Sequence, residues 1–310
     1  LLLQPRDYLA SYFLYFAVVI GTVGMVMGSS KFSVELPAYK GFVSGNNYLW
    51  PMLFIIVACG ALSGFHSLVG SGTTSKQIRR ESDSVLVGYG SMLIEGVVAV
   101  IALGTVMISG AILGDPTNTY AVGFGRFSEL IGIDPKIGKS LGLLALNSFL
   151  LTSLDTATRL TRYQIQELTN MKVDRYTATV IAVAGAMGLL LTKTHTTTGT
   201  LIPVWAAIWP VFGAANQLVG ALVLLALAVW VARALKKPNQ WLMLPMWFML
   251  ITTVAALGLM VRDNLINAAK PNWVLGGMAI LLLVLALLMV LQAFSALKRR
   301  DGAQLSHSGD

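Results

Sequence analysis

Long apolar runs separated by short polar segments dominate the chain. Eight of them have, or approach, the roughly 20 residues that a helix needs to cross the hydrocarbon core of a bilayer. None alternates apolar and polar residues as the strands of a membrane barrel do. The pattern therefore predicts an all-α integral membrane protein with about eight transmembrane helices, some of them discontinuous. The runs cover residues 9–28, 50–69, 84–113, 140–160, 178–191, 201–232, 241–261 and 273–297.

Composition indicates that lipid is the main solvent of this chain. Hydrophobic residues make up 55% and charged residues only 12%, against about 25% charged residues in typical soluble domains. The net charge of +8 comes from short clusters between the apolar runs and not from one basic face. We therefore expect the lipid bilayer as a partner and no nucleic acid.

Positive charges predict the orientation, because short cytoplasmic loops of membrane proteins are enriched in Lys and Arg. Most of these residues fall at the start of the chain and in alternate loops. We expect both ends of the chain to be cytoplasmic, in a cell (inner) membrane. Residues 1–297 should form the transmembrane helical domain, and residues 298–310 a polar, disordered cytoplasmic tail. The opening Leu1-Leu2-Leu3 resembles the end of an earlier element, so upstream material is expected to be missing.

The second apolar run carries glycines and polar side chains that a lipid-facing helix would not need. Gly60, Gly64 and His66 are followed by a Ser-Gly-Thr-Thr stretch. We expect a helix that unwinds inside the membrane, which is how many transporters bind substrates or ions. A packing seam of small residues, with His66 bonded to a neighbouring carbonyl, is the alternative. The candidate pathway residues here are His66, Ser71, Thr73 and Thr74.

Of the 14 acidic residues, only Glu95 and Asp155 fall within apolar runs. Glu95 lies roughly 16 Å along its helix, near mid-membrane. An ionised carboxylate is costly there, so proton coupling is the natural use, and a neutral Glu bonded to a neighbouring helix is the alternative. Asp155 and Arg159 are four residues apart and can pair, with the Thr158 hydroxyl nearby. Their alternative is an ion pair at the membrane interface.

The sixth run would be about 48 Å long as one helix, which is longer than the bilayer core requires. A kink or break is expected at Pro210, because proline lacks the N–H that a helix needs. Trp209, Asn216 and Gln217 could line a pathway near this point. Asn and Gln side chains are as often hydrogen-bonded between helices, and that alternative stays open.

These stretches resemble the carbon starvation protein A (CstA) family, and more closely the C-terminal half of a member. The resemblance implies that the missing N-terminal half of the same transporter is a partner of this chain. The likeness runs from Gln4 to about Leu225. It rests on Phe65-His-Ser with Ser71-Gly-Thr-Thr, Met92-Leu-Ile-Glu, Leu154-Asp-Thr-Ala-Thr-Arg and Trp209-Pro with Asn216-Gln.

The resemblance implies a polytopic inner-membrane transporter that takes up peptides or pyruvate, with proton coupling for pyruvate, and a link to carbon starvation. It also implies kinship with amino-acid-polyamine-cation (LeuT-like) carriers, whose bundles contain broken helices. The sequence departs from the family pattern at Ser75, where proline is expected, and at Thr156-Ala157, where a small residue and glycine are usual. A plain helix through Asp155 is therefore more plausible here.

The leading interpretation is a secondary active transporter for small carbon nutrients, either pyruvate or small peptides. It is not an enzyme, and it needs no cofactor beyond a coupling ion, expected to be a proton. A non-transporting sensory or assembly subunit is the alternative. A metalloenzyme is disfavoured, because the sequence contains no His-Glu-x-x-His motif. His195 and His307 fall in a loop and in the tail, away from His66. An ATP-driven pump is disfavoured, because the sequence has no P-loop: in the nearest match, Ile133 stands where the first glycine of that motif belongs.

Overall fold

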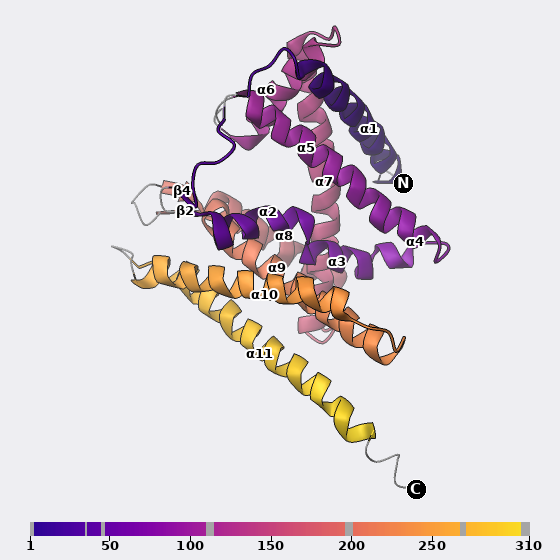
Figure 1. Cartoon of the computed structure of the whole chain (residues 1–310), viewed down its shortest axis with the longest axis vertical. Coiled ribbons are helices and arrows are strands. Elements are labelled where there is room, and N and C mark those ends of the chain that lie inside the picture. Colours follow the sequence, from indigo (N-terminus) through magenta and orange to yellow (C-terminus); the bar gives the residue numbers. More distant parts are fainter. Residues whose placement is uncertain are drawn as a thin grey trace. The chain divides into compact units, whose positions relative to one another are not determined.

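The computed structural model describes residues 3–34, 36–44, 47–109, 115–195, 201–266 and 271–304, and most of them are helical (Figure 1). Within these ranges, six helices are long and apolar enough to cross a membrane. The prediction of an all-α integral membrane protein is confirmed, whereas the count of eight spans is not. The six segments are Tyr8–Gly28, Asp83–Ser109, Pro135–Leu168, Val204–Arg233, Gln240–Ile266 and Trp273–Leu291.

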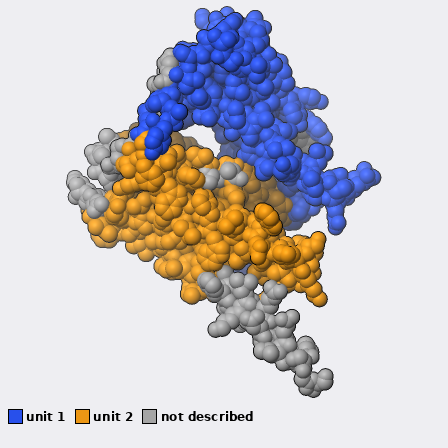
Figure 2. Space-filling view, viewed as in Figure 1, with its two compact units in different colours: residues 1–40, 74–179 blue, residues 41–73, 180–310 orange. Residues whose placement is uncertain are grey.

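The chain forms two compact units, each built from two separate stretches of sequence (Figure 2). Unit 1 comprises residues 1–40 and 74–179, and unit 2 comprises residues 41–73 and 180–310. The predicted transmembrane domain is thus divided between them, and each unit is described by itself.

Unit 1 has α6 at its centre, in contact with α1, α5 and α7. Its core joins Phe124 of α6, which is fully buried, to Ala17 of α1 and Ala145 of α7. Gly142 of α7 lies against Phe124 so closely that a Cβ would be 3.0 Å from its ring. The helical elements of unit 1 are α1 (Leu3–Gly28), η2 (Thr74–Lys76), α4 (Asp83–Val85), η3 (Leu86–Gly90), α5 (Ser91–Ser109), α6 (Pro116–Glu129), α7 (Pro135–Leu168) and the start of α8 (Arg175–Leu191).

Helix α6 lies between the third and fourth apolar runs, where no helix was predicted. Asp115 caps its N-terminus by accepting a hydrogen bond from the Asn118 backbone N–H at 2.6 Å, and Pro116 occupies the first turn. Asp134 and Pro135 begin α7 in the same way, five residues before the predicted start. An Asp-Pro pair is a recognisable start signal, because the aspartate satisfies a free N–H and proline has none to satisfy.

Unit 2 has α9 at its centre, in contact with α2, α3, α10 and α11. Its largest core cluster joins Ile55 of α2, Ala214 of α9, Leu257 of α10 and Ala279 of α11, all of them fully buried. The helical elements of unit 2 are η1 (Leu49–Leu53), α2 (Phe54–Ala61), α3 (Gly64–Gly72), the rest of α8, α9 (Val204–Arg233), α10 (Gln240–Val261), η4 (Arg262–Ile266) and α11 (Trp273–Gln304).

Two short antiparallel hairpins lie outside the long helices, both in unit 2. One pairs β1 (Val43–Ser44) with β2 (Asn47–Tyr48), and the other pairs β3 (Lys193–His195) with β4 (Leu201–Pro203). The sixth apolar run therefore begins in a strand and becomes helical only at Val204.

Helix α9 runs through Pro210 without a break, so of the kink or break expected there the break is wrong and the kink stays a prediction. Proline removes one backbone hydrogen bond, and the contacts of α9 with α2, α3, α10 and α11 keep it helical despite that loss. At the other end of the chain, α11 extends to Gln304 and thus includes part of the predicted tail. Residues 305–310 lie outside the described residues, and the disorder of the tail stays a prediction.

Candidate functional site

The second apolar run is divided into two short helices, as the glycine-rich sequence predicted. Helix α2 ends at Ala61, Leu62 and Ser63 are not helical, and α3 begins at Gly64. A break of this kind frees backbone N–H groups in the first turn of the second helix. Inside a membrane these groups need partners within the protein, because lipid offers none.

Two side chains accept hydrogen bonds from backbone N–H groups in the first turn of α3. The Ser63 hydroxyl accepts a hydrogen bond from the His66 backbone N–H at 3.4 Å. The Oδ1 atom of Asn216, on α9, accepts one from the Phe65 backbone N–H at 2.7 Å. The Asn216 amide group also donates to the Ser63 hydroxyl at 3.2 Å. Asn216, which lies on α9, thus caps the N-terminus of α3, and α9 holds the break in place.

Gln217, the next residue on α9, is hydrogen-bonded to two other helices. Its amide nitrogen donates to the backbone carbonyl of Phe54 on α2, at 3.0 Å. Its Oε1 atom accepts from the hydroxyl of Thr253 on α10, at 3.2 Å. Gln217 is 1% exposed and Asn216 6% exposed, so both amides are used inside the helix bundle.

Glycine makes the close approach of α3 to α9 possible. A Cβ on Gly64 would overlap the backbone carbonyl oxygen of Asn216 and lie 2.6 Å from the Cβ of Val219. Gly60, by contrast, has open space at its hypothetical Cβ: among the described residues, and apart from its own helix, no atom lies within 4 Å. The alternative of a packing seam is thus realised at Gly64 and not at Gly60, and it coexists with the break.

The polar side chains along α3 differ in what they contact. His66 is exposed, and its ring lies 6.3 Å from the neighbouring Phe65 ring, measured between centroids. The hydroxyls of Ser71 and Thr73 donate to carbonyls of their own helix, those of Ser67 and Val69. Thr74 begins the short turn η2 and belongs to unit 1.

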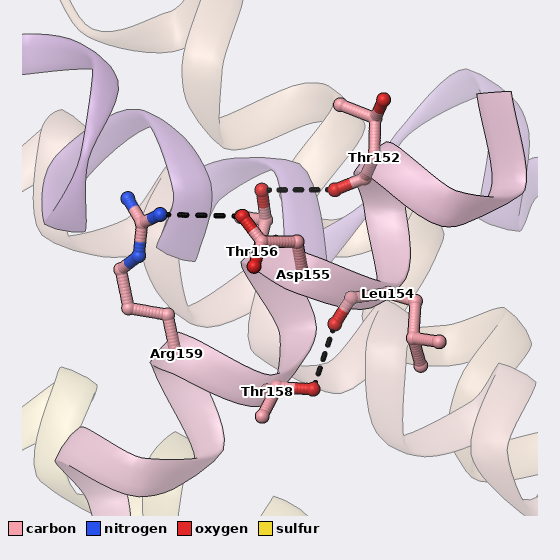
Figure 3. A network of polar contacts seen from close by, with 6 residues as sticks. All are labelled: Thr152, Leu154, Asp155, Thr156, Thr158 and Arg159. Carbon is pink, nitrogen blue, oxygen red and sulfur yellow. Dashed lines mark hydrogen bonds and ion pairs between the residues drawn. The ribbon is translucent and has the colours of Figure 1, made fainter. Parts of the chain in front are cut away.

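The Asp155 segment is helical throughout, in the middle of α7 (Figure 3). Arg159 pairs with Asp155 at 3.3 Å, as the spacing predicted, and both side chains are about one-third exposed. The Thr156 hydroxyl donates to the Thr152 carbonyl at 3.3 Å, and the Thr158 hydroxyl donates to the Leu154 carbonyl at 2.8 Å. The threonines are therefore hydrogen-bonded within the helix that carries them.

Glu95 and Trp209 are both exposed within their units. Glu95 lies in a part of α5 where the neighbouring residues are also exposed. Trp209 is 52% exposed and its ring lies 5.5 Å from that of Phe212. By helical spacing Trp209 is on the same side of α9 as Asn216, two turns before it.

The predicted residues are divided between the two units, and their pathway role stays a prediction. Unit 2 brings Asn216 and Gln217 to the α2–α3 break. The residues that sequence reasoning missed there are Ser63 and Thr253, and a serine directly before a glycine-led helix is a recognisable cap. Among the described residues, no three His, Cys, Asp or Glu side chains lie together as a metal site.

Outside the long helices, hydrogen bonds lower the pKa of Asp174, the residue before α8. Its carboxylate accepts hydrogen bonds from the Thr177 hydroxyl and from the backbone N–H groups of Tyr176 and Thr177. These bonds, that of the Thr177 hydroxyl above all, hold the pKa of Asp174 below its ordinary value. In unit 1, burial raises the pKa of the Tyr120 hydroxyl on α6.

Comparison with known proteins gives one consistent result. The family model "Carbon starvation protein CstA" matches residues 1–113 and 109–256. No solved structure matches the chain.

Relatives from several bacteria carry the names of transporters. The chain is 29% identical to the pyruvate/proton symporter BtsT of Escherichia coli, over 84% of this chain and 48% of that protein. It is 30% identical to the peptide transporter CstA of the same organism, over 83% of this chain and 46% of that protein. The peptide transporter CstA of Bacillus subtilis is 29% identical over 94% of this chain. The chain spans about half the length of the relatives it matches.

Proposed function

Because this chain belongs to the carbon starvation protein CstA family, we propose that it forms part of a secondary active transporter for small carbon nutrients. Pyruvate and small peptides are the two substrate classes, after the names of the E. coli relatives. The coupling ion is a proton, and the transporter works in a cell membrane with both ends of this chain in the cytoplasm. Resemblance to LeuT-like carriers gives the expected mode of action, which is alternating access.

The α2–α3 break is the observation that best supports this proposal. An anchor helix gains nothing from losing backbone hydrogen bonds in the membrane. A transporter, by contrast, uses the ends of broken helices to bind polar substrates near the midplane. Here Ser63 and Asn216 satisfy the first turn of α3, so the break can persist without a ligand. His66, exposed on that first turn, is then available to a substrate carboxylate.

Glu95 is the proposed proton carrier, because it is the one acidic residue in its apolar run. A carboxyl that is neutral in the membrane and ionised when it reaches water can load and release one proton per cycle. Asp155 and Arg159 supply the second polar station on α7, with Thr158 beside them.

Uptake into proteoliposomes tests this function. The full-length transporter is reconstituted, a pH gradient is imposed, and labelled pyruvate and dipeptides are supplied in turn. Glu95→Gln is expected to abolish gradient-driven uptake while leaving membrane insertion unchanged. Glu129→Gln, an exposed carboxyl on α6 outside the long apolar helices, is the matched control and should transport normally. Full uptake by Glu95→Gln would remove Glu95 from the coupling role. No uptake of either substrate by the parent protein would favour the sensory or assembly subunit.

A further inference from the structure

Arg162, in the C-terminal part of α7, has a hydrogen-bond donor without an acceptor. Its Nε atom is buried and has no partner among the described residues. The guanidinium lies over the ring of Tyr163, 4.8 Å from the ring centroid. A contact with the face of a ring uses none of the N–H groups, because these point outward in the guanidinium plane. Buried polar groups in proteins nearly always have partners, so this unsatisfied donor requires an explanation.

The neighbouring cation on the same side of the helix already has a partner. Asp155, Arg159 and Arg162 are four and three residues apart, so they follow one side of α7. The Asp155 carboxylate pairs with Arg159 at 3.3 Å (Figure 3). Arg162 lies roughly 10 Å further along the helix than Asp155, at a rise of about 1.5 Å per residue. The acidic residue on this side of α7 is therefore engaged by Arg159.

These three residues carry two positive charges and one negative charge. Glu167, the next acidic residue along the chain, is exposed and about 140° round the helix from Arg162. Two arginines one turn apart repel each other unless an anion lies near both. A cation without a counter-charge is also costly within a membrane-spanning segment. A bound monoanion would remove both costs.

A purely topological role would leave the nitrogens of Arg162 in water. Arginines that fix the orientation of a membrane protein lie near the cytoplasmic interface, and they extend their charged heads toward water. The Arg162 side chain is instead half-buried, with its Nε atom covered. A guanidinium group binds a carboxylate through two parallel hydrogen bonds, one of which can come from Nε. The unsatisfied donor therefore belongs to the part of the side chain that recognises carboxylates.

We propose that Arg162 binds the substrate carboxylate at the polar station on α7. Pyruvate and the C-terminus of a peptide are both carboxylates at neutral pH, so one arginine suits the two substrate classes named for the relatives. The Asp155–Arg159 pair beside it then limits the station to one negative charge. This position is separate from that of His66, which lies in the other unit. The inference rests on the proposed function, because it takes its ligand from the substrates proposed there.

Ligand-dependent thermal unfolding of the full-length transporter in detergent tests the proposal without relying on transport. Pyruvate and dialanine are each titrated, alongside the amides that lack their carboxylate charge, to give apparent Kd values. For the substrate that stabilises the parent, we expect Arg162→Gln to raise the Kd about tenfold or more, the loss expected for one charge-assisted hydrogen bond. The Kd of the corresponding amide should not change.

Two further variants keep the test decisive. Arg162→Lys retains the charge but lacks the Nε donor, so it should raise the Kd several-fold, and it replaces Arg162→Gln should that variant fail to insert. Arg175→Gln is the matched control. The Arg175 guanidinium lies over the Tyr176 ring in the same way, at 4.7 Å, but it is exposed at the start of α8. The control should leave the Kd unchanged.

An unchanged Kd in the Arg162 variants would overturn the proposal, as would equal losses in Arg162→Gln and Arg175→Gln. No stabilisation of the parent by pyruvate or dialanine would overturn it as well. The uptake assay tests the proposed function separately. A Kd that depends on Arg162 in a protein without uptake would uphold the carboxylate site and refute transport. Uptake with an unchanged Kd would refute the carboxylate site alone.

Discussion

The α2–α3 break and the Asp155 segment of α7 have similar compositions and opposite conformations. Both are rich in hydroxyl side chains inside a long apolar run, yet only the first interrupts its helix. In α7 the hydroxyls of Thr156 and Thr158 donate to carbonyls four residues back, so they add bonds to the helix and break none. At the break, Asn216 on α9 supplies the acceptor that the first turn of α3 lacks. A polar stretch therefore unwinds where another helix provides partners, and stays helical where its own carbonyls suffice.

The largest expected effect comes from adding a side chain at Gly64, where α3 and α9 are in direct contact. Gly64→Ala places a methyl group against the Asn216 carbonyl, which cannot move without shifting α9. We expect a loss of about 3 kcal/mol in stability, at the upper end for overpacked cores. The measurement is thermal unfolding in detergent. Gly60→Ala is the control, with open space around it, and should be neutral or stabilise by up to about 1 kcal/mol. Equal losses in both variants would contradict the close α3–α9 contact.

Removing the cap is expected to cost less than overlap with the backbone. Asn216→Leu leaves the Phe65 N–H buried without its acceptor, a cost of about 1–3 kcal/mol. Gln217→Leu should cost less, because its partners, the Phe54 carbonyl and the Thr253 hydroxyl, both lie in helices whose backbone offers alternative partners. The same unfolding assay ranks the two variants. A larger effect at Gln217 would show that the bond to α10, and not the cap, holds the break.

The Asp155–Arg159 pair is expected to matter little for folding. Both side chains are about one-third exposed, and ion pairs of this kind contribute about 0–1 kcal/mol. Asp155→Asn should therefore shift the unfolding temperature only slightly. If the pair belongs to the pathway, uptake falls strongly in the same variant, and Asp174→Asn provides a control outside the long apolar helices. A large loss of stability would instead make the pair structural.

The smallest effect is a local pH dependence at the start of α8. The folded pKa of Asp174 is lowered, so its capping bonds stabilise the helix above the ordinary value of 3.8 and are lost as the pH falls through the folded pKa. Amide hydrogen exchange at Thr177 should become faster in acid, relative to an unstructured peptide. Asp174→Asn should abolish the pH dependence. The cap of α3 contains no titratable group, so exchange at Phe65 should not change in this range.

Much of this fold follows from the sequence, because lipid imposes a simple rule on long apolar runs. The Asp155–Arg159 pair follows as well, since a spacing of four residues fixes it within one helix. Helix α6 was missed because its apolar content is too low for a transmembrane span. Asp115 and Pro116 are nevertheless a recognisable helix start. Interhelical hydrogen bonds of Asn216 were one of the two alternatives, but their partner at the break was missed. Asn216 is distant from Ser63 in the chain, and only the packing of α3 on α9 brings them together.

The central claim is that the α2–α3 break lies on the transport pathway, and cysteine accessibility at His66 tests it most directly. Cys59→Ser removes the native thiol, and His66→Cys is introduced in the full-length protein in membranes. A membrane-impermeant thiol reagent should modify this cysteine, and saturating pyruvate or dipeptide should slow the modification. A cysteine at residue 66 that stays unmodified from both sides of the membrane would contradict the account.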